Sequence, residues 1–335
     1  MPARKSQSKG DLKNFSFDFE SLSEGFVLAK PIQREAYDPK VLEELEKEGR
    51  LIITRKRDGW KLFALFNKNG KVRIFTDGLR DVSDRVPHIV KEFESLGWSK
   101  ALLVGEGVMV INGKDERTAA ASVLSSGPIR ALEVQEEMGF MRFVAFGIIF
   151  SLGACVLDLP YKILVNALKD LELQPSLKHV SGVEVVDETL ETAKKMVIEN
   201  KWEGLVLYDS EFRSSFRLDG KNPERVKGCY KWKPIYEDDF IVRKWFASKT
   251  DPERLKEVEI LQINPKTGKE FSCGKLGGFT NEMRKKLKKA RYPIVMQVNF
   301  DGRFASGKLD NARFADIRKD KKPKDCVAPK SFKIS

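Results

Sequence analysis

The sequence predicts an α+β protein in which antiparallel sheets with helices are followed by a small C-terminal β-barrel. Three observations lead to this prediction. At 335 residues, the chain can bury ample core and would ordinarily form two domains. Apolar runs rich in β-branched and aromatic residues alternate with amphipathic segments up to residue 235, and short strands with turns dominate afterwards. We therefore expect a flexible tail over residues 1–24, a larger domain over 25–235 and a barrel domain over 236–335.

The composition is that of a soluble globular protein with a basic surface. The net charge of +12 and the pI of about 9.3 suit a polyanionic partner, because neutralising phosphates releases counterions. Charge alone equally fits a ribosomal protein or a protein of the membrane surface. No apolar run is long enough to span a bilayer, and residues 1–14 are too polar for a signal peptide. We expect a cytoplasmic location, in a bacterium or in a virus-infected host cell.

Cysteine and histidine are sparse. The four cysteines are dispersed without a C-x-x-C pair, so we expect reduced thiols. Only His88 and His179 could join them as ligands, and a structural zinc site is therefore not expected.

The expected elements of the larger domain follow one another with turn signals between them. Residues 39–48 form an amphipathic helix that Gly49 ends. Residues 51–66 hold two apolar runs around a polar segment, which predicts strand, tight turn and strand. The strand over 62–66 then pairs with 71–76 across an Asn-Lys-Asn-Gly turn. Later helices are expected at 84–97, 116–125 (ending at Ser-Ser-Gly-Pro), 159–171 and 187–200, and strands at 101–111, 142–151, 183–186 and 202–208.

Several charged residues accompany buried strands. Glu106 lies between two glycines that interrupt an apolar strand, where a carboxylate is costly without a partner. Glu203 directly precedes a strand, and a carboxylate there can hold Mg²⁺ through oxygen and water. Lys231 and Lys233 alternate with two aromatic residues, so the lysines should face one side of their strand and the rings the other.

The C-terminal part begins after a boundary at residues 234–239. Short strands are expected at 239–246, 255–263, 270–274, 294–301 and 302–307, with one basic helix at 281–290. Five short strands with one helix suit a barrel of the oligonucleotide-binding (OB) type. The basic helix could track a phosphate backbone, although a charged helix face is commonly just solvated.

Lys56 is the candidate nucleophile. Arg55, Arg57 and Lys61 crowd it with positive charge, and like charges favour the neutral amine, which is the form that attacks an electrophile. The alternative is that these basic residues are solvated or bind phosphate.

The segment Lys56-Arg57-Asp58-Gly59 resembles the K-x-D-G signature of the covalent nucleotidyltransferases: ATP-dependent DNA ligases, RNA ligases and mRNA-capping enzymes. Further family-like segments follow in the expected order at residues 105–107, 146–150, 203–207, 231–234 and 313–321. The chain most resembles ATP-dependent DNA ligases of the minimal viral or bacterial type. This resemblance implies a nucleotidyltransferase domain with ATP-grasp-like antiparallel sheets and helices, followed by an OB-fold barrel.

The resemblance also implies roles for motif residues. Lys56 would carry AMP, and Asp58 would organise the turn or the 3′ side of the nick. Lys231 and Lys233 would stabilise the departing pyrophosphate, and Glu203 with Glu106 would hold the metal. The remaining residues assigned to cofactor binding are Thr54 (adenine edge), Arg55, Lys61 (5′-phosphate), Arg80 (ribose), Glu106 (ribose), Phe146 (purine stacking), Arg313, Arg318, Asp320 and Lys321 (pyrophosphate orientation).

The chain departs from the family pattern at three places. Thr76-Asp77 stands where ligases usually carry Ser-Arg, and Arg80 is the nearest substitute for the ribose contact. Gly147 stands where Asp usually follows the aromatic residue. Lys61 replaces the commoner arginine, which keeps the charge and loses the bidentate fork.

We therefore predict an ATP-dependent DNA ligase that seals 3′-hydroxyl/5′-phosphate nicks in duplex DNA through lysyl-AMP. It would act as a monomer away from membranes and use ATP with Mg²⁺ or Mn²⁺. An mRNA-capping guanylyltransferase and an RNA ligase are alternatives within the superfamily. A non-catalytic nucleic-acid-binding protein also explains the charge and the barrel. Each motif residue also has a purely structural interpretation when it is considered alone. Glu106 could be an exposed acid at a turn, and Phe146 could be a core residue. Glu203 could lie at a solvated strand end, and residues 313–321 could be a basic tail.

Overall fold

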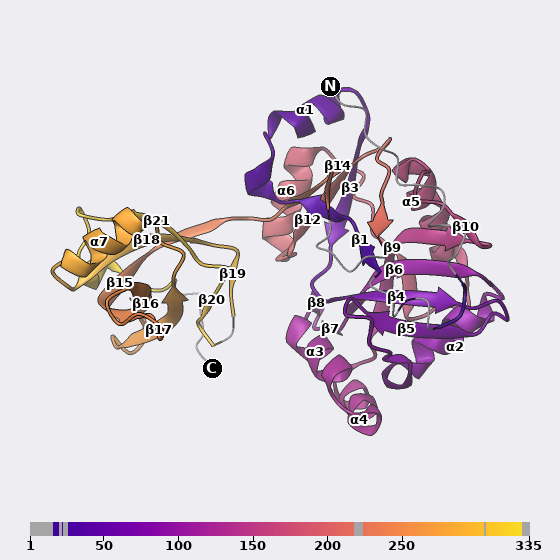
Figure 1. The fold of residues 1–335 in the computed structure, drawn as a ribbon, viewed down its shortest axis with the longest axis horizontal. Coiled ribbons are helices and arrows are strands. Elements are labelled where there is room, and N and C mark those ends of the chain that lie inside the picture. Colours follow the sequence, from indigo (N-terminus) through magenta and orange to yellow (C-terminus); the bar gives the residue numbers. More distant parts are fainter. Residues whose placement is uncertain (1–15, 20–21, 23–25, 218–223, 305, 330–335) are drawn as a thin grey trace. The chain divides into compact units, whose positions relative to one another are not determined.

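The structure is a computed structural model that describes residues 16–19, 22, 26–217, 224–304 and 306–329 (Figure 1). The chain divides into two compact units between Lys233 and Pro234. In the part of the chain that the structure describes, no helix has the length and hydropathy to cross a membrane.

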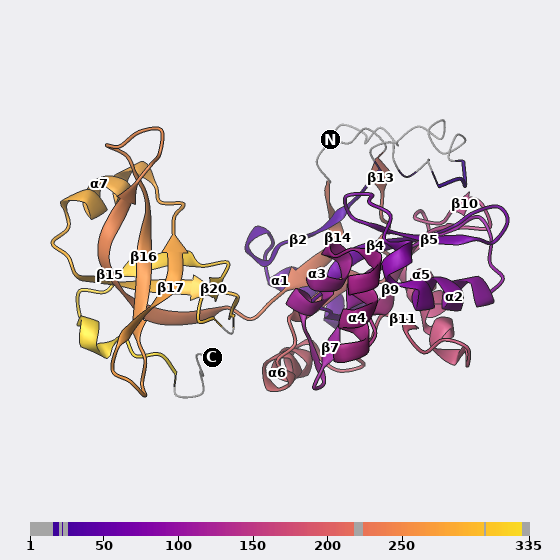
Figure 2. The same cartoon turned by 90° about the horizontal axis from the view of Figure 1, so that it is seen from below.

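Two main sheets form the first unit (Figures 1 and 2). The larger has the order β10 (Ala154–Cys155), β9 (Arg142–Ser151), β6 (Ala101–Val108), β4 (Trp60–Phe66) and β5 (Val72–Thr76), with β11 (Val180–Gly182) parallel to β9. The smaller has the order β2 (Lys30–Ile32), β14 (Arg225–Trp232), β12 (Gly204–Asp209) and β3 (Leu51–Lys56). Two-residue strands pair β1 (Val27–Leu28) with β13 (Phe216–Arg217) and β7 (Val110–Ile111) with β8 (Lys114–Asp115).

Helices supply the apolar surface that each sheet buries. Helices α1 (Lys40–Lys47) and α6 (Leu190–Asn200) pack their leucines on the smaller sheet, against Tyr230 and Trp232. The core of the larger sheet includes residues of α2 (Pro87–Ser95), α3 (Arg117–Ser125), α4 (Pro128–Met138) and α5 (Tyr161–Lys169). Single 3₁₀ turns cover Arg34–Ala36, Ser83–Arg85 and Asp170–Leu173. The apolar periodicity predicted helices correctly at 39–48, 84–97, 159–171 and 187–200.

Strands β3 and β4 belong to different sheets. Strand β3 pairs with β12, whereas β4 pairs with β5 and β6, so residues 57–59 connect the two sheets. The expected order of strand, turn and strand is correct, and the turn begins after Lys56. Lys56 is the last residue of β3, which is an outer strand of its sheet, so the amine is held on a sheet edge.

Gly59 is pressed against the backbone of β6. A Cβ atom at position 59 would lie 2.2 Å from Gly107 O and 2.9 Å from Val108 Cγ1. Gly107 is equally tight, because its Cβ would lie 2.5 Å from Leu62 Cδ1. The turn after Lys56 therefore needs glycine at position 59 to approach β6, and β6 needs glycine at position 107 to pack against Leu62 of β4.

Gly59→Ala is expected to lower the free energy of unfolding by about 1–3 kcal/mol, because the added methyl group must displace backbone. Gly78→Ala is the matched control, since its Cβ would have one close neighbour, Thr76 Oγ1, at 3.9 Å. We expect a change below about 0.5 kcal/mol for that control. Urea denaturation measures both, and equal midpoints would contradict the close approach at Gly59.

The helix expected at 116–125 is confirmed, because α3 ends at Ser125. A further helix, α4, begins at Pro128, because proline fits the first turn of a helix where no N–H is needed. Two expectations for the first unit differ from the structure. Residues 183–186 are not a strand but cover the edge of β3 through one bridge, Thr54 to Val185. Strand β6 continues through the Gly-Glu-Gly segment and ends at Val108.

Most of the tail expected over residues 1–24 lies outside the described residues. Within the described part, Leu22 is fully buried in the second core of the larger sheet. The Phe17 ring meets the Phe150 ring edge-on at a centroid distance of 5.3 Å. The expectation of a flexible tail is wrong at these two positions, because both side chains pack on the domain.

A five-stranded sheet forms the second unit. Its order is β17 (Glu270–Leu276), β16 (Leu255–Ile263), β15 (Tyr236–Ala247), β18 (Ile294–Phe300) and β21 (Arg313–Ile317). Helix α7 (Asn281–Lys289) contributes Leu287 to the core, the short strands β19 (Gly302–Arg303) and β20 (Leu309–Asp310) pair with each other, and a 3₁₀ turn covers Pro323–Asp325. The fifth strand is β21 and not the segment 302–307 that the sequence predicts. The OB assignment stays a prediction.

All four cysteines are free, as the sequence predicts. Cys229, Cys273 and Cys326 are buried, and Cys155 is half-buried. Burial raises the pKa of the Cys326 thiol to about 12. These thiols are therefore held in their neutral, unreactive form.

Candidate active site

Lys56 takes part in a buried ion-paired cluster where β3 ends and β12 begins. Its side chain is 16% exposed, and its Nζ donates to Glu203 Oε2. The other oxygen of that carboxylate, Oε1, lies 2.7 Å from Lys233 Nζ. Antiparallel pairing of Lys56 with Gly204 brings the two motifs together. One carboxylate therefore lies between two lysines.

The two lysines keep Glu203 ionised. Burial is the largest influence on Glu203 and opposes ionisation, yet the charges of Lys56 and Lys233 outweigh it and hold the pKa of Glu203 below its usual range. Gly204 allows the close approach of the strands, since a Cβ there would lie 2.2 Å from Trp232 O.

The basic neighbours of Lys56 in the sequence face carboxylates. Arg57 Nη2 lies 2.6 Å from Asp115 Oδ1, and Lys61 pairs with Asp77. Arg55 Nη1 lies 3.3 Å from Glu184 Oε2, with its guanidinium 4.7 Å from the centroid of the Trp202 ring. The sequence predicts that Arg55, Arg57 and Lys61 crowd the amine with positive charge, and the structure adds an acid beside each of them that offsets this charge.

Two further carboxyl groups interact with this cluster. Burial and then the charge of Glu203 raise the pKa of Asp58 to about 6, although Lys56 opposes the shift. Burial raises the pKa of Glu106 to about 7, with Lys56 opposing and Glu203 and Asp58 adding to the shift. The cost expected for a carboxylate in this apolar strand is visible as the raised pKa of Glu106.

Glu106→Gln is expected to stabilise the metal-free protein at neutral and higher pH. The folded-state pKa of about 7 lies above the ordinary value of 4.5, so the folded chain holds this proton to higher pH than the unfolded chain. Ionisation therefore costs stability as the pH rises from about 5 to 7, by up to about 3 kcal/mol, and the cost is constant above that range. Urea unfolding of both proteins in EDTA measures the difference. A difference that does not change with pH would contradict this explanation.

Lys231 and Lys233 face Glu203, on the side of the segment opposite the rings of Tyr230 and Trp232, as the alternating pattern predicts. Tyr230 and Trp232 are buried in the core beneath α1 and α6. Burial, followed by the positive charge of Lys56, lowers the pKa of Lys231 to about 8. The predicted alternation is confirmed.

Two side chains assigned to nucleotide contacts are engaged within the fold. Thr54 is buried, and its Oγ1 donates to Val206 O at 2.9 Å. The Arg80 guanidinium donates to the Leu124 carbonyl near the end of α3. The structure therefore does not bring the Arg80 guanidinium into the lysine cluster.

Phe146 is half-buried between the two cores of the larger sheet. It lines an apolar cavity of about 70 Å³ with Val104, Tyr161 and Tyr208. Gly147 leaves no side chain beside it, and a Cβ there would lie 2.9 Å from Val104 Cγ1. The aromatic face is thus held in an apolar setting.

The terminal-motif residues lie in the second unit, on and after β21. Arg313 Nη2 is 2.7 Å from Asp301 Oδ1. Arg318 Nη2 is 2.7 Å from Asp320 Oδ2, and Arg318 Nη1 is 3.3 Å from Asp239 Oδ1. Lys321 Nζ lies 4.0 Å from the same Asp239 carboxylate. The hydrogen bond from Arg318 lowers the pKa of Asp320 to about 2.

The carboxylates near Lys56 do not form a ready-made metal cage. Within the described ranges, no group of three or more His, Cys, Asp and Glu side chains could hold a metal ion. Mg²⁺ at phosphate-transfer sites usually takes only one or two carboxylates together with phosphate oxygens and water. Glu203 and Glu106 fit that smaller number, and a cation would favour the ionised form of Glu106 that burial disfavours.

Sequence reasoning misses three acids near the Lys56 segment: Asp77, Asp115 and Glu184. Each pairs with a basic residue of the segment 55–61. The signal in the sequence is general, because four cations within seven residues of a partly apolar segment need acids nearby. The sequence does not show which acids pair with these cations, because the pairs form only in the tertiary fold.

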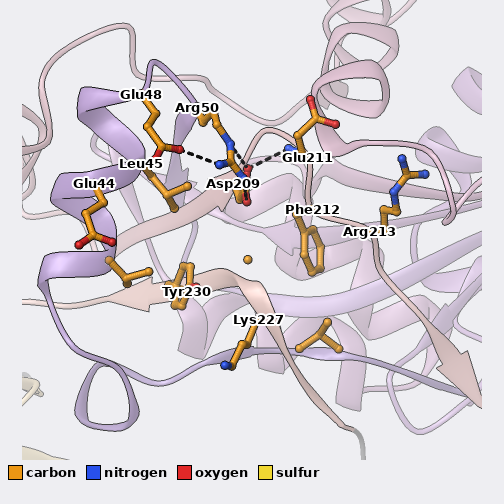
Figure 3. Close-up of a pocket in the computed structure, with 13 residues that line it drawn as sticks. Glu44, Leu45, Glu48, Arg50, Asp209, Glu211, Phe212, Arg213, Lys227 and Tyr230 are labelled. Atoms are coloured by element: carbon orange, nitrogen blue, oxygen red, sulfur yellow. Dashed lines mark hydrogen bonds and ion pairs between the residues drawn. The ribbon is translucent and has the colours of Figure 1, made fainter. Parts of the chain in front are cut away.

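A separate groove lies at the other end of β12 (Figure 3). There Arg50 Nη1 is 2.7 Å from Glu48 Oε2, and its Nη2 is 2.5 Å from Asp209 Oδ2. Asp209 pairs with Leu51 at the start of β3, whereas Lys56 is at the end, so this groove is not part of the lysine cluster. Acidic and basic side chains both line it, and no single ligand charge is favoured.

The first unit thus carries a lysine at the end of an outer strand, ion-paired with a largely buried acid beside a second lysine, within the mixed α+β architecture of a nucleotidyltransferase-like domain. A family model described as ATP dependent DNA ligase domain matches residues 27–233, which is more than half of the chain. The chain belongs to this family of ATP-dependent DNA ligase domains. The resemblance drawn from the motifs is thereby confirmed.

Solved ligase structures share the fold. A structure from a study of Lig E DNA ligases is 18% identical with a TM-score of 0.62, covering 87% of this chain and 99% of that chain. The ligase domain of M. tuberculosis LigD is 18% identical with a TM-score of 0.50, covering 90% and 98%. The protein named Pmar-Lig is 16% identical with a TM-score of 0.64, covering 88% and 68%. No curated protein sequence matches the chain.

Proposed function

We propose that this ligase seals nicks with a 3′-hydroxyl and a 5′-phosphate in duplex DNA through an AMP adduct on Lys56. The observation that carries the proposal is the buried pairing of Lys56 with Glu203 beside Lys233. It presents one amine at the edge of a sheet, within a group of positive side chains suited to polyphosphate. Membership of the ATP-dependent DNA ligase family indicates the class of reaction. The roles of the individual residues below are part of our proposal.

The first step transfers AMP to the enzyme. The Lys56 amine gives one proton to water, its neutral nitrogen forms a bond to the α-phosphorus of ATP, and a second proton passes from that nitrogen to water as the phosphoramidate forms. The bond from the α-phosphorus to the bridging oxygen breaks, and pyrophosphate leaves with the electron pair. Lys231 and Lys233 would stabilise the negative charge that gathers on the leaving group, and the interaction of both lysines with Glu203 supports this role.

The other residues proposed to contact ATP belong to the same unit as Lys56. Phe146 offers an aromatic face for the purine, and the Thr54 backbone offers the adenine edge a polar contact. Asp58 organises the turn beside Lys56. A ribose role for Arg80 requires its bond to Leu124 O to break, and a cofactor role for Arg55 requires it to leave Glu184.

Glu203 and Glu106 would hold Mg²⁺ or Mn²⁺ together with phosphate oxygens. When bound, such a cation supplies neutralisation of phosphate charge. Glu203 also pairs with Lys56 and Lys233. A cation bound to the same carboxylate would therefore hold the polyphosphate close to the Lys56 amine.

DNA binding completes the reaction. The 5′-phosphate of the nick attacks the lysyl-AMP phosphorus and releases Lys56, and the 3′-hydroxyl then displaces AMP. The net charge of +12 and the exposed lysines of α7 suit a sugar-phosphate backbone, with Lys61 at the 5′-phosphate and the second unit acting as an OB-type barrel. The protein would act as a monomer in the cytoplasm.

The terminal motif would assist the first step only. Arg313, Arg318, Asp320 and Lys321 would orient the pyrophosphate of ATP. Asp301 and Asp239 engage the three cations in the described structure, so the polyphosphate would compete with these acids.

Labelling with α-³²P nucleotides followed by sealing of a singly nicked DNA duplex tests the proposal. We expect a protein adduct from ATP, release of the label by nicked DNA, and a sealed strand. An adduct from GTP alone would indicate a capping enzyme, and sealing confined to nicked RNA would indicate an RNA ligase. DNA binding without any adduct would indicate a non-catalytic binding protein.

A further inference from the structure

Asp115 meets the turn that follows Lys56. It lies on β8, in the short hairpin just before α3, and its side chain is only 8% exposed. Asp115 Oδ1 is 2.6 Å from Arg57 Nη2, and Asp115 Oδ2 accepts from the Asp58 backbone N–H at 3.1 Å. One carboxylate thus binds a side chain and a main-chain group of consecutive residues.

These contacts constrain the nucleophile because of where the turn lies. Residues 57–59 connect the two sheets, Lys56 directly precedes them, and Gly59 is wedged against Gly107 O. The turn is therefore fixed by two contacts: the close approach of Gly59 to Gly107 O, and the hydrogen bond from the Asp58 N–H to Asp115. A shift of the Asp58 peptide would rotate the backbone from which the Lys56 side chain extends.

We propose that Asp115 is a positioning residue for adenylyl transfer, which fixes the Lys56 amine through its hydrogen bond to the Asp58 N–H. Arg57 serves this contact by keeping the Asp115 carboxylate charged and oriented. The inference rests on the proposed function, because the reaction that it serves is the attack of Lys56 on ATP. Asp115 touches neither the reacting atoms nor the amine. Misplacing a reacting group by about 1 Å costs about 100-fold in rate.

A pair of double variants isolates the hydrogen bond. Asp115→Ala alone would leave Arg57 buried without its closest acid, so both variants also carry Arg57→Met. Arg57→Met/Asp115→Asn keeps an oxygen that can accept from the Asp58 N–H, and Arg57→Met/Asp115→Ala does not. The two have the same net charge, so a difference between them does not arise from electrostatics.

Single-turnover labelling with ATP gives the test, with rates taken per folded molecule. We expect the asparagine variant to label Lys56 within about threefold of wild type. The alanine variant should be about 30- to 100-fold slower at saturating ATP, with KM for ATP changed less than about threefold. Equal rates for the two would overturn the inference. A loss confined to KM would also overturn it, because Asp115 would then act on ATP binding.

Hydrogen exchange of the Asp58 amide tests the contact without a measurement of activity. We expect this amide to be protected in wild type and to lose less protection in Arg57→Met/Asp115→Asn than in Arg57→Met/Asp115→Ala, measured in the folded state. Exchange of the wild-type amide at the rate of a free peptide would overturn the inference. If wild type itself takes no label from ATP, the proposed function fails, and the exchange result still decides the role of Asp115 at the turn.

Discussion

Lys56→Ala is expected to abolish the AMP adduct and the sealing of an ordinary nick. The first transfer forms a bond to the Lys56 nitrogen, and the structure offers no equivalent amine in that position on β3. We expect labelling from ATP to fall below about 1/1,000 of wild type, since a covalent route is removed and not merely slowed. Lys56→Arg should behave in the same way, because arginine stays protonated.

A nick that already carries AMP on its 5′-phosphate provides the internal control. The last step needs DNA, the 3′-hydroxyl and the rest of the site, so both variants should still seal this substrate. Lys71→Ala is the matched surface control, because its side chain is 70% exposed and only loosely paired with Glu94. It should label like wild type. A normal adduct in Lys56→Ala would refute the assignment of the nucleophile, which mass spectrometry of the labelled peptide would then reassign.

Glu203→Gln is expected to slow labelling by at least about 100-fold. The amide cannot balance two ammonium groups, so Lys56 and Lys233 would repel each other where a carboxylate now lies between them. Removing one partner of a buried charge cluster also costs about 3–5 kcal/mol of stability. Single-turnover labelling and urea denaturation measure the two effects separately.

Glu184→Gln is the matched control for Glu203→Gln. Glu184 also pairs with cations, Arg55 and Arg57, but its side chain is 46% exposed. We expect less than a threefold change in labelling, because exposed pairs contribute little. If both substitutions slow labelling equally, Glu203 acts only through general charge balance and not through its position between the lysines. Adding Lys233→Met to Glu203→Gln should restore stability without restoring the rate.

The fold of the first unit follows from local patterns to a large extent. The apolar run at 142–151 predicts β9 with its observed limits, and the Asn-Lys-Asn-Gly turn predicts the β4–β5 hairpin. Local patterns fail where the same signal has two meanings. Proline after residue 127 both stops α3 and starts α4, and the apolar runs around Gly59 do not tell one sheet from two.

The candidate site is predictable as a set of residues and less so as a set of contacts. Glu203 before a strand and the alternating lysines at 231 and 233 are visible in the sequence, and the fold brings them to Lys56. The partners of Arg55 and Arg57 are not visible, because Asp115 and Glu184 reach them through long-range packing. A count of cations along the chain omits these acids, because only tertiary structure brings them to the segment 55–61.

The pairing of β3 with β12 joins two residues that are 147 positions apart. Neither half of the chain contains the ion pair, so attachment of AMP to Lys56 would require that β12 has paired with β3. If labelled ATP is added at intervals during refolding, the fraction of protein that carries label should equal the fraction in which the smaller sheet has formed. Labelling would therefore measure the rate at which this domain assembles.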